Sequence, residues 1–293
     1  MPLTVLSLGE ISPEMLYLDL MKRVLSDSIF IDHPLAHLVP YQIKVGTPWI
    51  KRQFLWMISG LLARYRITMA ESNDSFTHEE RVLAIANGTF WPARAHTMIG
   101  HKRLNNLQTC VESVLRHSVP GDLIETGVWR GGACIFMRAI LKAYGDETRS
   151  VWVADSFEGL PSPSPNKYKA DEGDQWHTFD ILAIPLEEVQ SNFRRYGLLD
   201  DRVRFLKGWF KDTLPIAPID RLAVLRLDGD MYESTIQALE ALYDKLSPGG
   251  FVIIDDFSLP PCAQAVGDFR SARGIKDALI DIDGSGSYWQ RSA

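Results

Sequence analysis

Two acidic clusters stand directly after short apolar runs in the second half of the sequence. Asp228 and Asp230 follow the run at positions 222–227, and Asp255 and Asp256 follow the run at positions 250–254. Short runs of β-branched and other apolar residues are typical of buried parallel strands. Because the carboxyl ends of such strands line the ligand crevice of an open α/β sheet, these four carboxylates are expected to lie close together.

Four carboxylates in one crevice repel one another. Two unit charges about 4 Å apart cost roughly 4 kcal/mol at an effective dielectric constant of about 20. A positive partner is therefore expected, and a hard divalent cation such as Mg²⁺, which prefers oxygen ligands, is the natural candidate. The alternative is that these acids cap helices or face water, which is the commoner role of a single acid.

A glycine-rich segment lies between the first predicted strand and the first predicted helix. It contains Glu125-Thr126-Gly127-Val128 and, after two further residues, a pair of glycines. Glycine lets the backbone turn sharply and approach a ligand. An acid at a strand end followed by such a turn is the pattern with which class I methyltransferases bind S-adenosylmethionine. The segment lacks the second glycine of a dinucleotide motif, which disfavours NAD.

Two further positions extend this ligand-binding pattern. The second predicted strand ends at Asp155 and Ser156, where an acid that binds both ribose hydroxyls is expected. The alternative role of Asp155 is to cap a helix or a turn. Gly208 and Trp209 follow the third predicted strand, and Trp209 either stacks on an adenine ring or packs in the interior.

The elements that must position these residues alternate from about Gly121 onward. The predicted strands cover residues 122–126, 150–155, 203–207, 222–228 and 250–255. The predicted helices cover residues 133–144, 185–196, 234–246 and 262–273. This alternation predicts an α/β fold with a mostly parallel sheet and helices on both of its faces.

Local signals predict where some of these elements end. Ser234 and Thr235 are expected to cap the helix at 234–246, and the Ser-Pro-Gly-Gly segment at 247–250 is expected to end it. The tail segments 278–282 and 288–291 flank Gly284 and Gly286. They resemble a hairpin that closes one edge of the sheet.

Residues 1–92 differ in pattern from residues 93–293. Segments such as Pro13–Leu25 and Thr77–Ala86 have helical spacing, and no strand alternation is evident. We therefore expect a helical N-terminal extension over residues 1–92 that lies against a ligand-binding domain over residues 93–293. The proline-containing segment 161–178 is expected to form a long loop, and such loops are usually functional lids or disordered inserts.

The composition argues against several classes of function. The chain has 293 residues and a net charge of -6, without a basic stripe for a nucleic-acid partner. Cys110, Cys134 and Cys262 are widely spaced, as in a reduced cytosolic enzyme without structural zinc. No signal-peptide pattern or bilayer-length apolar stretch is evident. We expect a soluble cytoplasmic protein without a membrane partner.

Several of these segments together resemble the macrocin-type O-methyltransferases. The similar segments are Thr97-Met98-Ile99-Gly100, Glu125 to Gly132, Asp155 to Pro161, Phe205 to Pro215 and Leu227 to Thr235. The resemblance is dense from Ala93 to Arg291 and looser before it. Long similar strings in the same order are specific for the family and less specific for the substrate.

The resemblance implies a Rossmann-like class I methyltransferase sheet, S-adenosylmethionine, a magnesium ion and a sugar hydroxyl as acceptor. The metal-binding acids of the family match Asp228, Asp255 and Asp256, and its proposed general base matches Asp230. Family members are oligomeric, so a homodimer is expected. The cofactor-binding residues expected from pattern and resemblance together are Thr97, Met98, Glu125, Thr126, Gly127, Val128, Asp155, Ser156, Gly208, Trp209 and Asp228.

The acceptor pocket is expected beside the loop that follows Asp155. Phe157 and Leu160 are expected to line this pocket, and the proline-containing segment is expected to close over it. His177 belongs to another segment that resembles the family and is a candidate for substrate contact, although a lone loop histidine is more often a surface residue.

The expected reaction is methylation of a sugar hydroxyl on a glycosylated natural product, a macrolide or a similar antibiotic. Two alternatives stay open here: methylation of a lipid-linked or surface glycan, and a nucleotide-dependent enzyme of another class, such as a dehydrogenase. A non-catalytic scaffold is disfavoured, because it has no need to hold so many uncompensated acids.

Overall fold

A seven-stranded sheet organises the computed structural model, which describes residues 12–30, 38–40, 48–65, 70–72, 77–90, 92 and 94–292. Its strands are β3 (Asp122–Thr126), β4 (Val151–Asp155), β5 (Val203–Lys207), β6 (Leu222–Leu227), β7 (Leu246–Ile254), β8 (Ile280–Asp281) and β9 (Ser287–Gln290). Their order is β5-β4-β3-β6-β7-β9-β8. The strands β3 to β7 pair in parallel, whereas β9 and β8 form an antiparallel edge. The prediction of a mostly parallel sheet with a C-terminal hairpin is confirmed.

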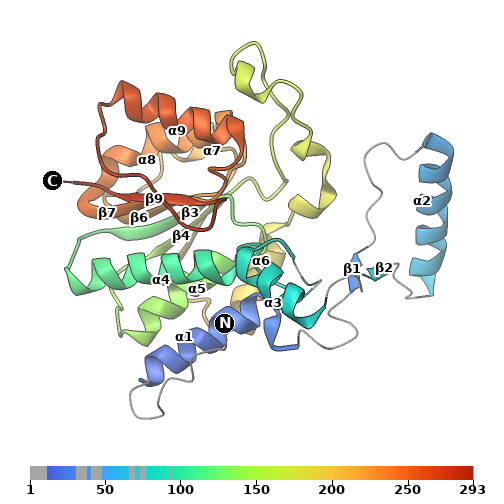
Figure 1. Ribbon diagram of the computed structural model, residues 1–293, viewed down its shortest axis with the longest axis horizontal. Coiled ribbons are helices and arrows are strands. Elements are labelled where there is room, and N and C mark those ends of the chain that lie inside the picture. Colours follow the sequence, from blue (N-terminus) through green and yellow to red (C-terminus); the bar gives the residue numbers. More distant parts are fainter. Residues whose placement is uncertain are drawn as a thin grey trace.

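Helices cover both faces of this sheet (Figure 1). The first face carries α1 (Pro13–Leu25), α4 (His101–Arg116), α5 (Gly132–Ala143) and α6 (Leu186–Arg195), and the second carries α7 (Phe210–Thr213), α8 (Tyr232–Leu242) and α9 (Pro260–Ala272). Successive strand residues point to opposite faces, so Leu123 belongs to the core under the first face and Ile124 to the core under the second.

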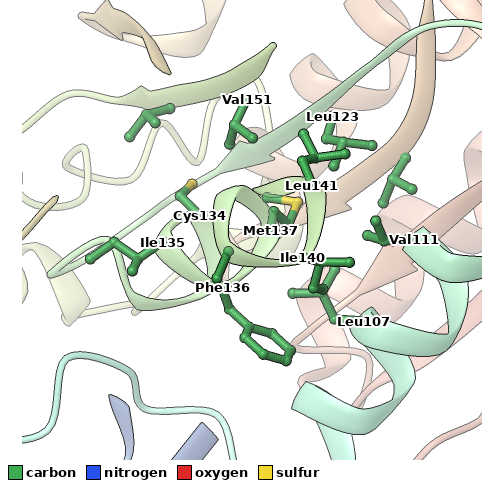
Figure 2. Packing of buried hydrophobic residues seen from close by; sticks show 14 of the residues in the cluster. Leu107, Val111, Leu123, Cys134, Ile135, Phe136, Met137, Ile140, Leu141 and Val151 are labelled. Carbon is green, nitrogen blue, oxygen red and sulfur yellow. The ribbon is translucent and has the colours of Figure 1, made fainter. Parts of the chain in front are cut away.

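The helix α5 is buried from Gly132 to Leu141. Figure 2 shows Ile140 of α5 beside Leu107 of α4, and Leu141 beside Leu123 of β3. This packing on both sides holds the start of α5 in place. The glycine-rich segment that leads into α5 is therefore held against the ends of the strands.

The start of α8 differs from the prediction. The helix begins at Tyr232 with Met231 as its N-cap residue, so Ser234 and Thr235 lie inside its first turn. The carboxylate of Asp171, far away in the sequence, accepts the backbone N–H groups of Tyr232 and Glu233 at 2.7 and 2.9 Å. A tertiary contact thus replaces the local cap that the sequence suggested.

The segment at 247–250 also differs from the prediction. It does not end a helix, because a short 3₁₀ helix (Tyr243–Lys245) leads directly into β7, which begins at Leu246. Leu246 pairs with Leu222, and the register with β6 shifts before it resumes at Val224 and Phe251. The Ser247 hydroxyl donates to the Pro120 carbonyl oxygen at 2.6 Å, which fixes the segment at the base of the sheet.

The described part of the N-terminal region is mainly helical, as expected. It includes α2 (Trp49–Arg64) and α3 (His78–Asn87), and Leu18, Met21 and Leu25 of α1 are buried in the core under the first face. A short antiparallel pair, β1 (Leu38–Pro40) with β2 (Ala70–Ser72), was not expected from the sequence. The boundary between residues 92 and 93 stays a prediction. No helix among the described residues combines the length and the apolar character that a bilayer crossing requires.

Candidate active site

A cavity of about 610 Å³ lies at the C-terminal ends of the parallel strands. Residues that follow each of β3, β4, β5, β6 and β7 line it, which is the place where open α/β sheets bind ligands. Its outer wall comes from the loop between β4 and α6, including Leu160, Pro161, Trp176, Phe179 and Leu182. This loop was expected to close over the acceptor pocket, and its residues do line one wall of the cavity.

Most of the residues expected from the sequence meet in this cavity. Those that line it are Thr97, Met98, Glu125, Gly127, Val128, Asp155, Ser156, Leu160, Trp209, Asp228, Asp230, Asp255 and Asp256. We call the part formed by Glu125, Gly127, Val128, Asp155 and Ser156 the glycine-rich half. We call the part formed by Asp228, Asp230, Asp255 and Asp256 the acidic half.

Four expected residues do not line the cavity. Phe157 is buried in the core with its ring 6.5 Å from that of Phe205, because a left-handed backbone at Phe157 turns the chain away from the crevice. His177 lies exposed in a short 3₁₀ helix (Trp176–Thr178) of the loop. Thr126 and Gly208 are not among the lining residues; the Thr126 carbonyl oxygen accepts the N–H of Asp228, and the Gly208 N–H donates to the Asp155 carbonyl oxygen.

The acidic half brings three carboxylates to one point. Asp228, Asp255 and Asp256 each offer an oxygen atom, and these atoms lie within 4.8 Å of one another. Asp230 stands beside them in a left-handed turn with φ of 57°, and its backbone N–H donates to Asp256 Oδ2 at 3.1 Å. Aspartate tolerates this backbone region better than most residues, so the turn presents the Asp230 side chain at little cost.

A buried guanidinium connects the two halves. Arg226 Nη1 donates to Glu125 and, at 2.9 Å, to Asp228 Oδ2, while Arg226 Nη2 donates to Asp255. Arg226 is 1% exposed and lies on β6, between the neighbouring strands β3 and β7. Part of the positive charge that the acidic clusters were expected to need is therefore supplied by the chain itself.

A second arginine was also missed in the sequence. Arg103 of α4 donates to Asp255 at 2.5 Å and to Asp283 at 3.0 Å. The signal for Arg226 was available, since a charged residue inside an apolar strand run must find buried partners. No comparable signal marked Arg103, because its partners lie more than 150 residues away in the sequence.

The arginines leave two carboxylates of the acidic half without a cationic partner among the described residues. Burial and the neighbouring Asp228 and Asp255 raise the pKa of Asp230 to about 8. Burial and the neighbouring Asp230 also raise the pKa of Asp256 well above its ordinary value. The acidic half thus holds more negative charge than the chain neutralises.

The acidic half suits a divalent metal ion. Its three converging oxygens are hard donors of the type that Mg²⁺ prefers, and the raised pKa of Asp230 and Asp256 indicates a deficit of positive charge at this point. The guanidinium groups do not exclude such an ion, because a carboxylate oxygen that accepts one hydrogen bond retains a second lone pair.

Hydrogen bonds within the chain hold the carboxylate of Asp155 in the glycine-rich half. Asp155 accepts the backbone N–H groups of Val128 and Phe157, both at 2.7 Å. Gly127 has φ of 82°, and a Cβ there would lie 1.6 Å from the backbone oxygen of Asp228. The glycine is therefore required for close approach to the end of β6, whatever ligand lies above it.

Two contacts connect the outer loop to these halves. Trp129 Nε1 donates to the Ile181 carbonyl oxygen at 2.8 Å, which joins the loop to the glycine-rich turn. The Asp171 carboxylate caps α8, directly after the turn that carries Asp230. The loop wall is thus attached to both halves of the cavity.

Comparison with known proteins identifies the family. The model of the macrocin O-methyltransferase (TylF) family matches residues 14–291 of the chain. A tetracenomycin 4'-O-methyltransferase from Streptomyces olivaceus, whose named substrate is 8-demethyl-8-(2,3-dimethoxy-alpha-L-rhamnosyl)-tetracenomycin C, is 51% identical and is aligned over 95% of this chain and 93% of its own length. The mycinamicin III 3''-O-methyltransferase of Micromonospora griseorubida is 48% identical, aligned over 95% of this chain and 97% of its own length.

A solved structure agrees with these relationships. The O-methyltransferase NovP superposes with a TM-score of 0.78 at 47% sequence identity, covering 96% of this chain and all of its own. A third relative by sequence is the demethyldecarbamoylnovobiocin O-methyltransferase of Streptomyces niveus. It is 55% identical and is aligned over 75% of this chain and 86% of its own length. The chain is therefore an O-methyltransferase that belongs to the macrocin O-methyltransferase (TylF) family.

Proposed function

We propose that the protein transfers a methyl group from S-adenosylmethionine to a sugar hydroxyl of a glycosylated natural product, with a divalent cation in the acidic half. The acceptors named for the relatives, which include a rhamnosylated tetracenomycin, mycinamicin III and a novobiocin precursor, support this substrate class. The observation that carries the proposal is the convergence of Asp228, Asp255 and Asp256 beside Asp230 in one cavity.

Asp230 acts as the general base in this proposal. Its carboxylate takes the proton of the acceptor hydroxyl, and a base in this role contributes about 10² to 10⁴ in rate. A divalent cation held by Asp228, Asp255 and Asp256 would lower the pKa of a bound hydroxyl. Its charge would also oppose the repulsion that raises the pKa of Asp230, so that this carboxylate is ionised at neutral pH.

The glycine-rich half is assigned to the methyl donor. When bound, S-adenosylmethionine supplies the methyl group on a sulfonium. Asp155 Oδ2 accepts the Val128 N–H and retains a lone pair for a ribose hydroxyl, and Trp209 lines the same cavity after β5. In this proposal, Thr97, Met98 and Ser156 complete the wall that holds the donor beside the acceptor and excludes water.

Methyl transfer to the acceptors named for the relatives tests the proposal. Purified protein, S-adenosylmethionine and Mg²⁺ are incubated with each of the three acceptors, and products are analysed by mass spectrometry. We expect one methyl group on the sugar of at least one acceptor, loss of activity with EDTA and recovery with Mg²⁺. Cofactor binding without transfer to any of the three would contradict the proposed acceptor class, and full activity after metal removal would contradict the metal.

The dimer is a separate part of the proposal. The helix α2 lies apart from the sheet in Figure 1, and its Trp49, Phe54 and Met57 are exposed. Exposed apolar groups of this kind support association with a second chain. Sedimentation equilibrium measures the mass directly, and a monomer over the whole concentration range would contradict the dimer.

A further inference from the structure

Glu233 is a buried acid in the cavity that the proposed reaction does not use. It lies in the first turn of α8, three residues after Asp230, and only 8% of its surface is exposed. Glu233 and Gln237, one helical turn later, both line the cavity. Its position is fixed at the backbone, since the Glu233 N–H donates to Asp171 Oδ2 at 2.9 Å.

The two carboxylate oxygens of Glu233 have different surroundings. Glu233 Oε1 accepts the side-chain amide of Gln237 at 2.9 Å. Glu233 Oε2 is buried and has no hydrogen-bond partner among the described residues. A buried carboxylate oxygen without a donor is unfavourable, so a donor from a bound ligand would stabilise this arrangement.

We propose that Glu233, oriented by Gln237, binds a second hydroxyl of the acceptor sugar, on a carbon close to the hydroxyl that is methylated. This proposal rests on the proposed function, because it assigns a role within the acceptor site. Asp230 lies in the turn directly before α8, Glu233 lies in the first turn of α8, and both line the same cavity. A sugar ring offers hydroxyl donors on successive carbons, so one ring can supply a proton to the first acid and a hydrogen bond to the second.

Such a contact determines specificity more than rate. A site that hydrogen-bonds a substrate hydroxyl discriminates strongly against the analogue without it, because the buried partner is then left unpaired. A hydrogen bond to a charged group corresponds to about a tenfold to hundredfold change in affinity. Gln237 is a positioning residue, since its amide holds the carboxylate in one orientation.

Sugar binding by variants tests this inference. The probe is methyl α-L-rhamnopyranoside, a simple glycoside of the sugar in the name of the tetracenomycin relative, together with its monodeoxy derivatives. Dissociation constants are measured by NMR titration of protein loaded with S-adenosylhomocysteine and Mg²⁺. The variants are Glu233→Gln and a matched control, Glu240→Gln, at an exposed position of the same helix.

We expect one monodeoxy derivative to bind the wild type about tenfold to hundredfold more weakly than the parent glycoside. Glu233→Gln is expected to bind the parent glycoside more weakly than the wild type does, by a similar factor. This variant is expected to bind that monodeoxy derivative no more weakly than it binds the parent. Glu240→Gln is expected to match the wild type, and all three proteins are expected to bind S-adenosylhomocysteine equally, which checks the fold.

Equal binding of the parent by wild type and Glu233→Gln would overturn the inference, as would undetectable binding of every glycoside by the wild type. The methyl-transfer assay separates this failure from that of the proposed function. If the wild type methylates a glycosylated acceptor while Glu233→Gln retains the wild-type KM, the proposed function stands and the role of Glu233 is rejected.

Discussion

The glycine-rich half and the acidic half of the cavity hold their carboxylates in different ways. In the glycine-rich half, burial raises the pKa of Asp155, but the Val128 and Phe157 N–H groups oppose this effect. In the acidic half, burial and all the neighbouring carboxylates act in one direction on Asp230 and raise its pKa to about 8. In the first half, N–H groups of the chain oppose the effect of burial, whereas Asp230 and Asp256 in the second half have no cationic partner among the described residues.

The contacts of two arginines determine which carboxylates of the acidic half are neutralised. Arg226 contacts Glu125, Asp228 and Asp255, and Arg103 contacts Asp255, so both neutralise the side of the acidic half that adjoins the sheet. Neither contacts Asp230 or Asp256 in a described interaction. The deficit of positive charge is therefore concentrated where the acceptor hydroxyl is proposed to lose its proton.

The largest expected effect is on turnover. Asp230→Asn removes the proposed base and should lower kcat by about 10² to 10⁴ while S-adenosylhomocysteine binding stays unchanged. Single-turnover methyl transfer and calorimetry measure the two quantities, with Asp212→Asn as an exposed control. Near-normal kcat would remove Asp230 from the base role, and lost cofactor binding would show that the halves are not independent.

A comparably large effect is expected on stability when the connection between the halves is broken. Arg226→Met leaves the buried Glu125 and Asp255 and the half-buried Asp228 without their shared cation and should lower the free energy of unfolding by about 3 to 5 kcal/mol. Arg226→Lys keeps the positive charge but not the planar guanidinium, so its free energy of unfolding should fall by less. Urea denaturation measures both free energies, with Arg221→Met at an exposed position as the control. If Arg226→Met were as stable as the wild type, the stabilising role of Arg226 would be refuted.

A smaller effect is expected on the pH dependence of stability, with and without Mg²⁺. The pKa of Asp255 is raised to about 6 by burial, and that of Asp230 to about 8. Acids with raised folded-state pKa contribute stability at low pH that is lost as the pH rises through those values, here from about 4 to 8. Metal-free protein should lose this contribution over that range, and Mg²⁺ should stabilise more at pH 8 than at pH 6.

Thermal unfolding in EDTA and in excess Mg²⁺ measures this dependence. A ligand at about 100 times its dissociation constant stabilises by about 2.7 kcal/mol. Asp256→Asn should abolish most of the stabilisation by Mg²⁺. Titrating groups elsewhere in the chain affect both proteins equally, so their contribution cancels in the difference between wild type and variant. A Mg²⁺ effect that is independent of pH would contradict the proposed charge deficit.

The smallest expected effect concerns the loop that covers the acidic half. Asp171→Asn weakens the cap on Tyr232 and Glu233 and should lower the free energy of unfolding by about 1 kcal/mol, as for other helix caps. Exposed Asp180→Asn is the matched control in the same loop. Chemical denaturation measures the loss, and no difference between the two variants would show that the cap does not stabilise α8.

Much of the fold was accessible from the sequence because strand and helix periodicity is local. The strands Asp122–Thr126 and Val203–Lys207 were predicted with their observed ends, and the other parallel strands were found with shifted ends. The helix α4 was not predicted, although it supplies Arg103. The start of α8 was misplaced because Ser234 and Thr235 suggested a cap that Asp171 provides instead.

The sequence by itself determined the fold class, the family pattern and the meeting of acids at the strand ends, since parallel strands bring their carboxyl ends to one edge. Only the tertiary structure decided which side chains share the cavity. It placed Leu160 in the wall and Phe157 in the core, and it brought Arg226 between two acidic strand ends. These outcomes depend on backbone turns, on strand order and on partners distant in sequence, which local pattern does not encode.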